Sequence, residues 1–192
     1  MLNVETISLT GKELKWCYNH AHSIVDYWGG EKSLGSGTYG HNKVDGNLVG
    51  VKCELGMTRW LQRYFDDDEI KSNFKSFDDS GKRGDICCHG KIIEVKGLRP
   101  WQWSHHRVKE PTTYRRMVPP TQLKKYVKNN AIVVWVTSTG NTLNKFVEIK
   151  GWNYAYEVQN KGKLVQTICS NMWLKNDKDM RDMKSLVVNL KS

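Results

Sequence analysis

Apolar residues recur with helical spacing in two stretches of the first third of the chain. Over residues 11–28 they return every three or four positions from Leu14 onward, and Gly29-Gly30 ends the run. A second stripe, over about 52–65, contains Met57 and Phe65. Each pattern is typical of a helix that buries one face. Seven of the sixteen glycines fall within residues 29–50, which predicts a loop between the two helices.

Strand-like patterns dominate the centre of the chain. Residues 85–88 and 91–98 are short runs joined by the turn-prone His89-Gly90, which predicts a hairpin. The run 131–136 is apolar at every position, as expected for a strand buried on both faces.

Weaker patterns complete the expected element order. A helix is predicted near 121–129, and further strands over 146–149 and 154–158. The tail, residues 175–192, is expected to pack as a final helix or strand. This order predicts an α/β or α+β sheet covered by helices.

Length and composition narrow the class of protein. The chain has 192 residues, which suits one domain, and 30 basic against 20 acidic side chains give a formal charge of +10. No apolar run approaches the roughly 20 residues that cross a bilayer, and the first residues lack a signal-peptide pattern. We therefore expect a soluble cytoplasmic protein with no membrane partner. Five cysteines, an odd number, are expected to be reduced thiols.

The positive charge gathers between residues 98 and 130, where Glu110 is the single acid and all four prolines lie. A cationic loop of this kind suits a phosphate backbone, so DNA is the expected partner. A solvated basic surface without a partner is the alternative, and the two tryptophans of the loop could instead seal the core. The candidate nucleic-acid-binding residues are Arg99, Trp101, Trp103, Arg107, Lys109, Arg115, Arg116, Lys124 and Lys125.

Two groups of residues are expected to have no special chemistry. The acidic residues 66–69 and 78–79 are interpreted as a solvated turn region. Cys87-Cys88-His89 lacks the ligand spacing of a structural zinc site, so buried strand thiols are favoured there.

Acidic side chains converge in the predicted hairpin. Alternation along residues 91–97 places Ile92, Glu94 and Lys96 on one face of the strand. Across the turn, Asp85 falls opposite Glu94. Two carboxylates at that distance repel unless they are protonated or bridged by a cation, and oxygen ligands suit Mg²⁺ or Mn²⁺. An exposed strand face holding a Glu–Lys pair is the alternative.

A third acid, Glu54, lies on the inward stripe at the start of the second predicted helix. A carboxylate on a core-facing stripe is unusual. A first-turn glutamate that favours the helix dipole and points to solvent is the other interpretation. Beside Asp85 and Glu94, the inward placement is favoured.

The chain resembles the PD-(D/E)XK nuclease superfamily in four motifs within about residues 50–136. Gly84-Asp85, eight residues, then Glu94-Val95-Lys96 is similar to its core motif, with glycine where proline often stands. Glu54 resembles the extra glutamate that many members place before the hairpin. Gln122 and Tyr126 are similar to the Q-x3-Y motif of a helicase-linked exonuclease branch. No four-cysteine arrangement for that branch's iron–sulfur cluster is evident.

The resemblance implies a restriction-endonuclease-like α/β fold, a central mixed β-sheet flanked by helices, over a single domain 1–192. The core motifs would span about 50–136, with the helix 11–28 and residues 146–192 as additions. It also implies a Mg²⁺ (or Mn²⁺) ion held by Asp85, Glu94, the Val95 carbonyl and Glu54. Lys96 would orient the attacking water, Gln122 would position Lys96 or the water, and Tyr126 would pack beside it.

The expected activity is hydrolysis of phosphodiester bonds by a metal-dependent DNA endonuclease. An exonuclease of the same fold is one alternative, and a catalytically inactive nucleic-acid-binding module is another. A coincidental motif in an unrelated basic protein is a third. The endonuclease is preferred because no helicase or clamp domain accompanies the motifs, and a homodimer would let two copies cut both strands.

Overall fold

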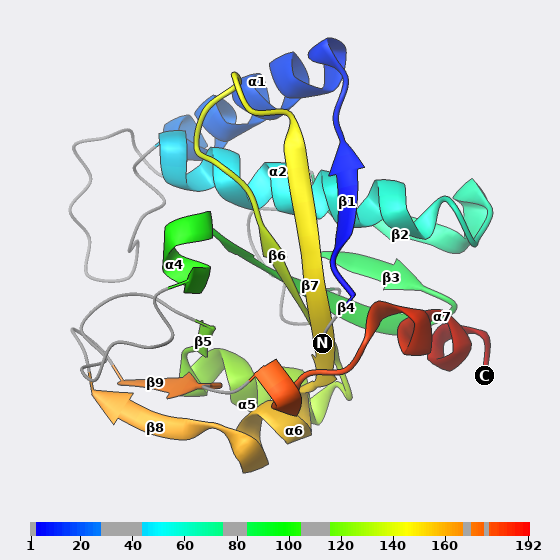
Figure 1. Cartoon of the computed structure of the whole chain (residues 1–192), viewed down its shortest axis with the longest axis vertical. Coiled ribbons are helices and arrows are strands. Elements are labelled where there is room, and N and C mark those ends of the chain that lie inside the picture. Colours follow the sequence, from blue (N-terminus) through cyan, green and yellow to red (C-terminus); the bar gives the residue numbers. More distant parts are fainter. Residues whose placement is uncertain (1–2, 28–43, 75–83, 105–115, 167–169, 175–176) are drawn as a thin grey trace.

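The computed structural model of the chain describes residues 3–27, 44–74, 84–104, 116–166, 170–174 and 177–192. A six-stranded sheet forms its centre (Figure 1). In spatial order the strands are β1 (Glu5–Ser8), β7 (Phe146–Tyr154), β6 (Ile132–Thr137), β4 (Lys91–Leu98), β3 (Ile86–Cys88) and β2 (Ile70–Ser72). β4 and β6 run parallel, whereas the other neighbouring pairs are antiparallel. A mixed sheet flanked by helices is thereby confirmed.

Helices cover both faces of this sheet. α1 (Gly11–Tyr27), α2 (Val44–Leu61) and α7 (Met183–Lys191) contribute to one apolar core. On the other face, α5 (Pro120–Lys128) and α6 (Ala155–Lys161) contribute to a second core. The parallel pair β4–β6 separates the two cores, as expected for strands with both faces covered.

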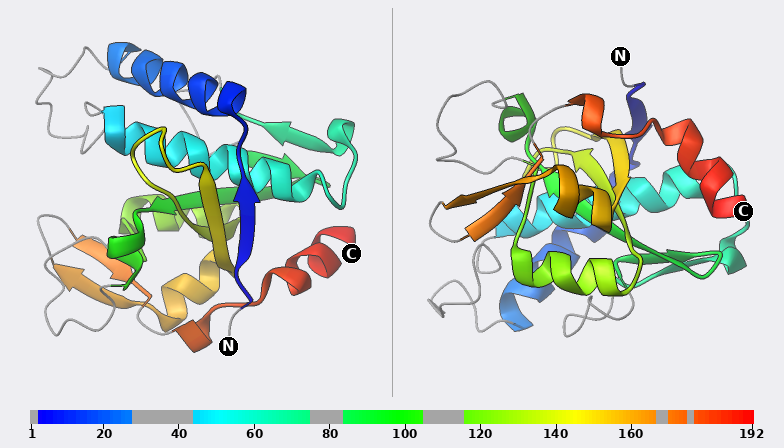
Figure 2. Two further views of the ribbon diagram at one scale, coloured as in Figure 1. Left: turned by 45° about the horizontal axis from the view of Figure 1, so that its top comes forward. Right: turned by 90° about the horizontal axis from the view of Figure 1, so that it is seen from below.

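A small antiparallel sheet packs against α5 and α6 (Figure 2). It contains β5 (Met117–Val118), β9 (Ser170–Trp173) and β8 (Lys163–Gln166). The short helix α4 (Pro100–Ser104) follows β4, and two 3₁₀ turns are η1 (Asp67–Glu69) and η3 (Asp177–Asp179). None of these elements was predicted, because each is too short to show a period.

Close packing between α2 and β4 depends on Gly97. A Cβ added at Gly97 would lie 3.2 Å from the Cys53 Sγ atom and 3.3 Å from the Gly50 Cα atom. The helix backbone therefore crosses directly over the strand. This approach brings the next residue of the helix, Glu54, beside β4.

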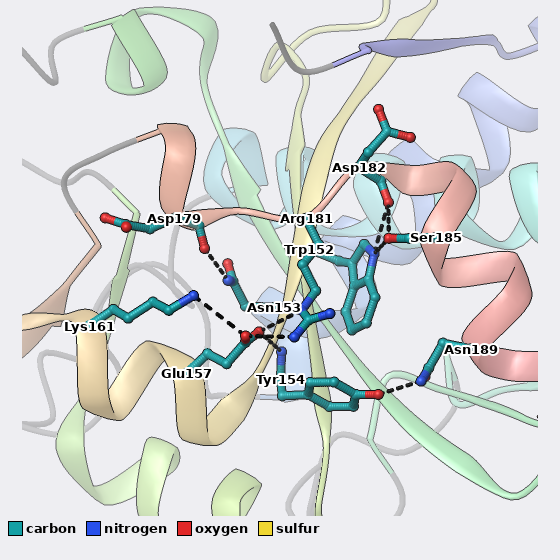
Figure 3. Close-up of polar contacts among 10 residues, drawn as sticks. All are labelled: Trp152, Asn153, Tyr154, Glu157, Lys161, Asp179, Arg181, Asp182, Ser185 and Asn189. Atoms are coloured by element: carbon teal, nitrogen blue, oxygen red, sulfur yellow. Dashed lines mark hydrogen bonds and ion pairs between the residues drawn. The ribbon is translucent and has the colours of Figure 1, made fainter.

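The C-terminal segment is fastened to β7 by polar contacts (Figure 3). The Trp152 indole nitrogen donates to the Asp182 carbonyl oxygen at 3.0 Å and to the Ser185 hydroxyl at 3.1 Å. The Arg181 guanidinium donates to both oxygens of the buried Glu157 carboxylate, at 3.0 and 2.9 Å. These contacts hold α7 in place, and the Trp152, Arg181 and Glu157 side chains that form them are hydrogen-bonded within the protein.

Several predicted elements are confirmed. Helix α1 matches its predicted range to within one residue, the hairpin of β3 and β4 forms across His89-Gly90, and every residue of β6 is buried. The tail forms a helix, α7. The acidic residues 66–69 form an exposed turn around η1, as expected, and residues 78–79 lie outside the described residues.

Two predictions about local structure are wrong. Residues 154–158 are not a strand, because β7 runs on to Tyr154 and α6 begins at Ala155. A capping box starts this helix: the Tyr154 N–H donates to the Glu157 carboxylate at 3.1 Å. Residues 44–50 are not a loop, because α2 begins at Val44; it also ends at Leu61 instead of 65. The rest of the glycine-rich segment lies outside the described residues.

Within the described ranges, no helix is long and apolar enough to span a bilayer.

Candidate active site

The site lies where β3 and β4 diverge. His89 and Gly90 both have positive φ, 49° and 74°, so they form the tight turn that joins the two strands. Because Ile86 pairs with Ile93, Asp85 stands opposite Glu94, as the sequence predicts. The Asp85 N–H donates to the Ile93 carbonyl at 3.1 Å, and β3 does not extend beyond this point. Beyond Ile93, β4 therefore has no strand partner on the β3 side within the described residues, and we call this unpaired edge of β4 the opening.

The Asp85 side chain reaches into this opening. Its Oδ2 atom accepts a hydrogen bond from the Val95 N–H at 2.6 Å, taking the place of the missing strand. The N–H and C=O of one strand residue point to the same side, so the Val95 carbonyl faces the same opening. Asn73 supports the arrangement: its N–H donates to the Asp85 carbonyl at 2.9 Å. Sequence analysis missed Asn73, because nothing in its neighbourhood marks it.

Gly84 is required at the position before Asp85. Its φ of +66° is unfavourable for any residue with a Cβ, and an added Cβ would lie 2.5 Å from the Ile92 Cγ2 atom. Proline is excluded there because its ring fixes φ near −65°. Glycine therefore fits the backbone at this position, whereas proline does not.

Glu94 is 1% exposed, and its Oε1 atom has no hydrogen-bond partner within the described structure. Burial raises the pKa of this carboxyl, and the Asp85 charge raises it further. Lys96 opposes the rise, and the pKa is about 8. A buried oxygen without a partner is costly, so this atom is suited to accept a cation or a hydrogen bond.

Glu54 and Asp85 share this electrostatic environment. Burial raises the pKa of Glu54, and the charges of Asp85 and Glu94 raise it further. The pKa of Asp85 is also raised, because burial outweighs the opposing effects of Lys96 and the Val95 N–H. The acidic groups of α2, β4 and the residue before β3 therefore influence one another's pKa. The Lys96 ammonium opposes the rise in all three pKa values, but burial, together with the neighbouring negative charges at Glu54 and Glu94, outweighs it.

Lys96 is held by two side chains of α5. Its Nζ atom donates to the Tyr126 hydroxyl at 2.7 Å and to the Gln122 Oε1 atom at 3.3 Å. The Tyr126 hydroxyl in turn donates to Gln122 at 3.2 Å. One helical turn separates these two residues, so they share a face. Burial lowers the pKa of Lys96, but Tyr126, Glu94 and Asp85 outweigh it, so the pKa is raised and the ammonium stays charged.

Hydrogen bonds join three of the predicted side chains, Lys96, Gln122 and Tyr126, and Asp85 bonds the Val95 backbone between Glu94 and Lys96. Glu54 is half-buried on α2, and the charges of Asp85 and Glu94 raise its pKa, which favours the inward placement over the solvent-facing alternative. Val95 contributes its backbone to the same opening.

The basic residues behave less uniformly. Arg116 is 1% exposed, with its guanidinium 4.8 Å from the centre of the Trp103 ring. Its prediction as a surface contact to nucleic acid is therefore wrong, because the side chain is a core cation packed on an aromatic ring. Trp103 itself is partly buried against the second core, which favours its alternative as a core seal.

Of the other residues predicted to bind nucleic acid, some are exposed and one forms an ion pair within the protein. Arg99 forms an ion pair with Asp45 at 2.7 Å. Trp101 is 47% exposed, and Lys124 and Lys125 are exposed on α5. Arg107, Lys109 and Arg115 lie outside the described residues. The charged surface next to the site therefore includes α5 itself.

The donor atoms fit a divalent metal ion in their chemistry. Three carboxylates and a backbone carbonyl are the oxygen ligands that Mg²⁺ and Mn²⁺ prefer. Within the described ranges, no three His, Cys, Asp or Glu residues are drawn together as a ready-formed metal site. Cys87 is half-buried and Cys88 is buried, and each is a free thiol. Neither belongs to a group of potential metal ligands within the described ranges.

No family model, curated protein or solved structure matches the chain. The function proposed below therefore depends on the geometry of these side chains.

Proposed function

We propose that the protein is a divalent-metal-dependent DNA endonuclease of the PD-(D/E)XK type, with a restriction-endonuclease-like fold. The arrangement that supports this most strongly is Asp85 opposite Glu94 and bonded to the Val95 N–H at 2.6 Å, with Lys96 held next to them by Tyr126. Glu54 interacts electrostatically with both acids. Three acids with raised pKa values and one charged lysine are not needed to stabilise a fold. They suit a reaction in which a cation and a phosphate group occupy the same place.

Each residue has a role in hydrolysis of a phosphodiester bond. A Mg²⁺ or Mn²⁺ ion, bound by Asp85, Glu94, the Val95 carbonyl and Glu54, would lower the pKa of a water molecule and neutralise charge on the phosphoryl oxygens. Lys96 remains charged and stabilises the negative charge that develops on those oxygens. Gln122 and Tyr126 fix the direction of its ammonium group through the two hydrogen bonds from its Nζ atom.

DNA is the proposed substrate because the excess positive charge lies beside these acids. Lys124 and Lys125 are exposed on the helix that carries Gln122 and Tyr126, and the chain has a formal charge of +10. A phosphate backbone that reaches Lys96 would pass this surface. A homodimer that cuts both strands is part of the proposal.

The test is cleavage of closed circular DNA, duplex and single-stranded, and of linear DNA, in Mg²⁺, Mn²⁺ or chelator. We expect metal-dependent cutting of the circles by the native chain. Asp85→Asn should reduce the rate at least about a hundredfold, because it removes one carboxylate from the site. The matched control is Asp68→Asn, which changes an exposed acid in the turn around η1 and should leave the rate unchanged.

Three outcomes would contradict the proposal in different ways. A strict requirement for free DNA ends would make the enzyme an exonuclease. Full activity of Asp85→Asn would show that Asp85 is not part of the active site. Binding of DNA without hydrolysis in either metal would show that the protein is a catalytically inactive nucleic-acid-binding module.

A further inference from the structure

A row of side chains on the outer face of α1 is not used by the proposed chemistry. Lys12, Trp16 and His20 lie four residues apart, so they follow one line along the helix. Lys12 is exposed and Trp16 is 41% exposed. A large indole that remains this accessible is a candidate for contact with another molecule.

The Trp16 ring is fixed from two sides. It stacks on the His20 ring with 5.1 Å between the centroids and 7° between the planes. The Phe74 ring meets it edge-on, at 5.1 Å and 80°. His20 is itself tied to the Phe74 backbone by a hydrogen bond, and burial lowers its pKa, so at neutral pH the ring is uncharged. The indole is therefore held by two neighbouring rings while 41% of the residue stays exposed.

This stack is linked to the carboxylate site through Phe74, whose ring contacts Trp16. Phe74 follows Asn73, whose N–H donates to the Asp85 carbonyl at 2.9 Å. The Trp16 stack is thus joined to Asp85 through two successive residues that follow β2.

A flat ring held in place beside a phosphate-handling site matches the chemistry of an unpaired nucleobase. Base stacking on an aromatic side chain tolerates any sequence, since every base has a π-face. Lys12, an exposed lysine one helical turn before Trp16, supplies a positive charge on the same line of the helix, which suits a phosphate group. A protein partner would be expected to require a wider apolar surface than one indole.

We propose that Trp16 is a stacking platform for an unpaired base of single-stranded DNA, with Lys12 contacting the adjacent phosphate. The position of the bound strand relative to the three carboxylates depends on the proposed nuclease function. The stacking itself does not. The substrate class that follows is DNA with a single-stranded segment at the site of cleavage.

The test is binding of a fluorescently labelled oligothymidylate and of a duplex of equal length, in chelator so that no cleavage occurs. Trp16→Ala should weaken binding of the single strand about tenfold, within the range of one base stacked on one aromatic ring, and duplex binding much less. Trp16→Phe keeps an aromatic face and should recover most of the affinity. The matched control is Tyr18→Ala, which removes a 44% exposed aromatic ring from another side of the same helix.

Unchanged affinity of Trp16→Ala for the single strand would overturn the inference, as would an equal loss in Tyr18→Ala. Failure of the native chain to bind oligothymidylate would also overturn it. Circular dichroism of each variant separates loss of binding from loss of fold. The binding assay contains no metal and measures no cleavage. A failure to cleave DNA in the separate cleavage assay would therefore count against the proposed nuclease function alone.

Discussion

Two lysines, Lys52 buried and Lys96 half-buried, have surroundings that shift their pKa values in opposite directions. The Lys52 side chain is 0% exposed, and its Nζ atom donates to the carbonyl oxygens of Thr139, Asn141 and Asn144 at 3.0, 3.0 and 2.7 Å. All these acceptors are neutral. Burial lowers the pKa of Lys52, whereas the pKa of Lys96 is raised.

The difference lies in what surrounds each ammonium group. Three carbonyls match the three N–H bonds of Lys52, so its hydrogen bonding is complete and the group fastens α2 to residues 139–144. Lys96 donates to two neutral side-chain oxygens and stands among carboxyl groups with raised pKa values. A lysine whose three N–H bonds are all satisfied by carbonyls stabilises the fold, whereas the lysine among ionisable acids is the one for which we propose a role in the reaction.

Of the replacements compared, Lys96→Met should have the largest effect, and that effect should be on the cleavage rate and not on stability. We expect Lys96→Met to reduce the rate of DNA cleavage about a thousandfold, because the charge that stabilises the phosphoryl oxygens is lost. The temperature of unfolding should change by only a few degrees, since the lysine satisfies no buried carbonyl. A steady-state cleavage assay combined with thermal unfolding checks both parts. Cleavage at the native rate would place Lys96 outside the chemistry.

Replacement of Lys52 should give the converse result. Lys52→Met leaves three backbone carbonyls without their donor, so we expect the free energy of unfolding to fall by about 2–4 kcal/mol. Cleavage per folded molecule should persist at low temperature. Denaturant unfolding measures the loss, with Lys15→Met, an exposed lysine of α1, as the control. A variant as stable as the native chain would show that the carbonyls find water instead.

The charged cluster should also make stability depend on pH. In the metal-free protein the pKa of Glu94 is about 8, against an ordinary value of 4.5, because of burial and the Asp85 charge. The folded state therefore keeps a proton that the unfolded chain loses. This contribution to stability is complete below about pH 4.5 and is lost as the pH rises through 8.

Glu94→Gln removes the share of this dependence that comes from Glu94, whereas Glu54 and Asp85 keep theirs. In chelator at pH 8 we expect the variant to unfold about 5 °C above the native chain, with the two converging toward pH 5. Mg²⁺ should raise the unfolding temperature of the native chain more than that of the variant. Thermal unfolding across this pH range measures both effects, and a native chain that is equally stable at pH 5 and 8 would contradict the proposed electrostatic cost.

The acids and the lysine of the site could be predicted because their signals are local or periodic. The turn at His89-Gly90 fixes the register that sets Asp85 opposite Glu94, and one helical turn relates Gln122 to Tyr126. Likewise β6 is identifiable from its uninterrupted apolar run. In each case the sequence neighbours determine the geometry.

Features that depend on distant contacts could not be predicted. Asn73 and Lys52 meet their partners only in the folded chain. Arg116 packs on the Trp103 ring, but the basic segment around it suggests a surface residue. The segment 154–158 alternates like a strand, but the cap formed by Tyr154 and Glu157 starts a helix instead. Tertiary packing and local hydrogen bonds override the pattern at these positions.

The contacts of Lys52 also have a kinetic consequence. Its three acceptors lie 87, 89 and 92 residues further along the chain, so the contacts cannot close before the intervening strands have assembled. Interactions that form after the transition state slow unfolding and leave the rate of folding almost unchanged. We infer that Lys52 contributes chiefly to the lifetime of the folded chain, and little to the speed with which that chain is reached.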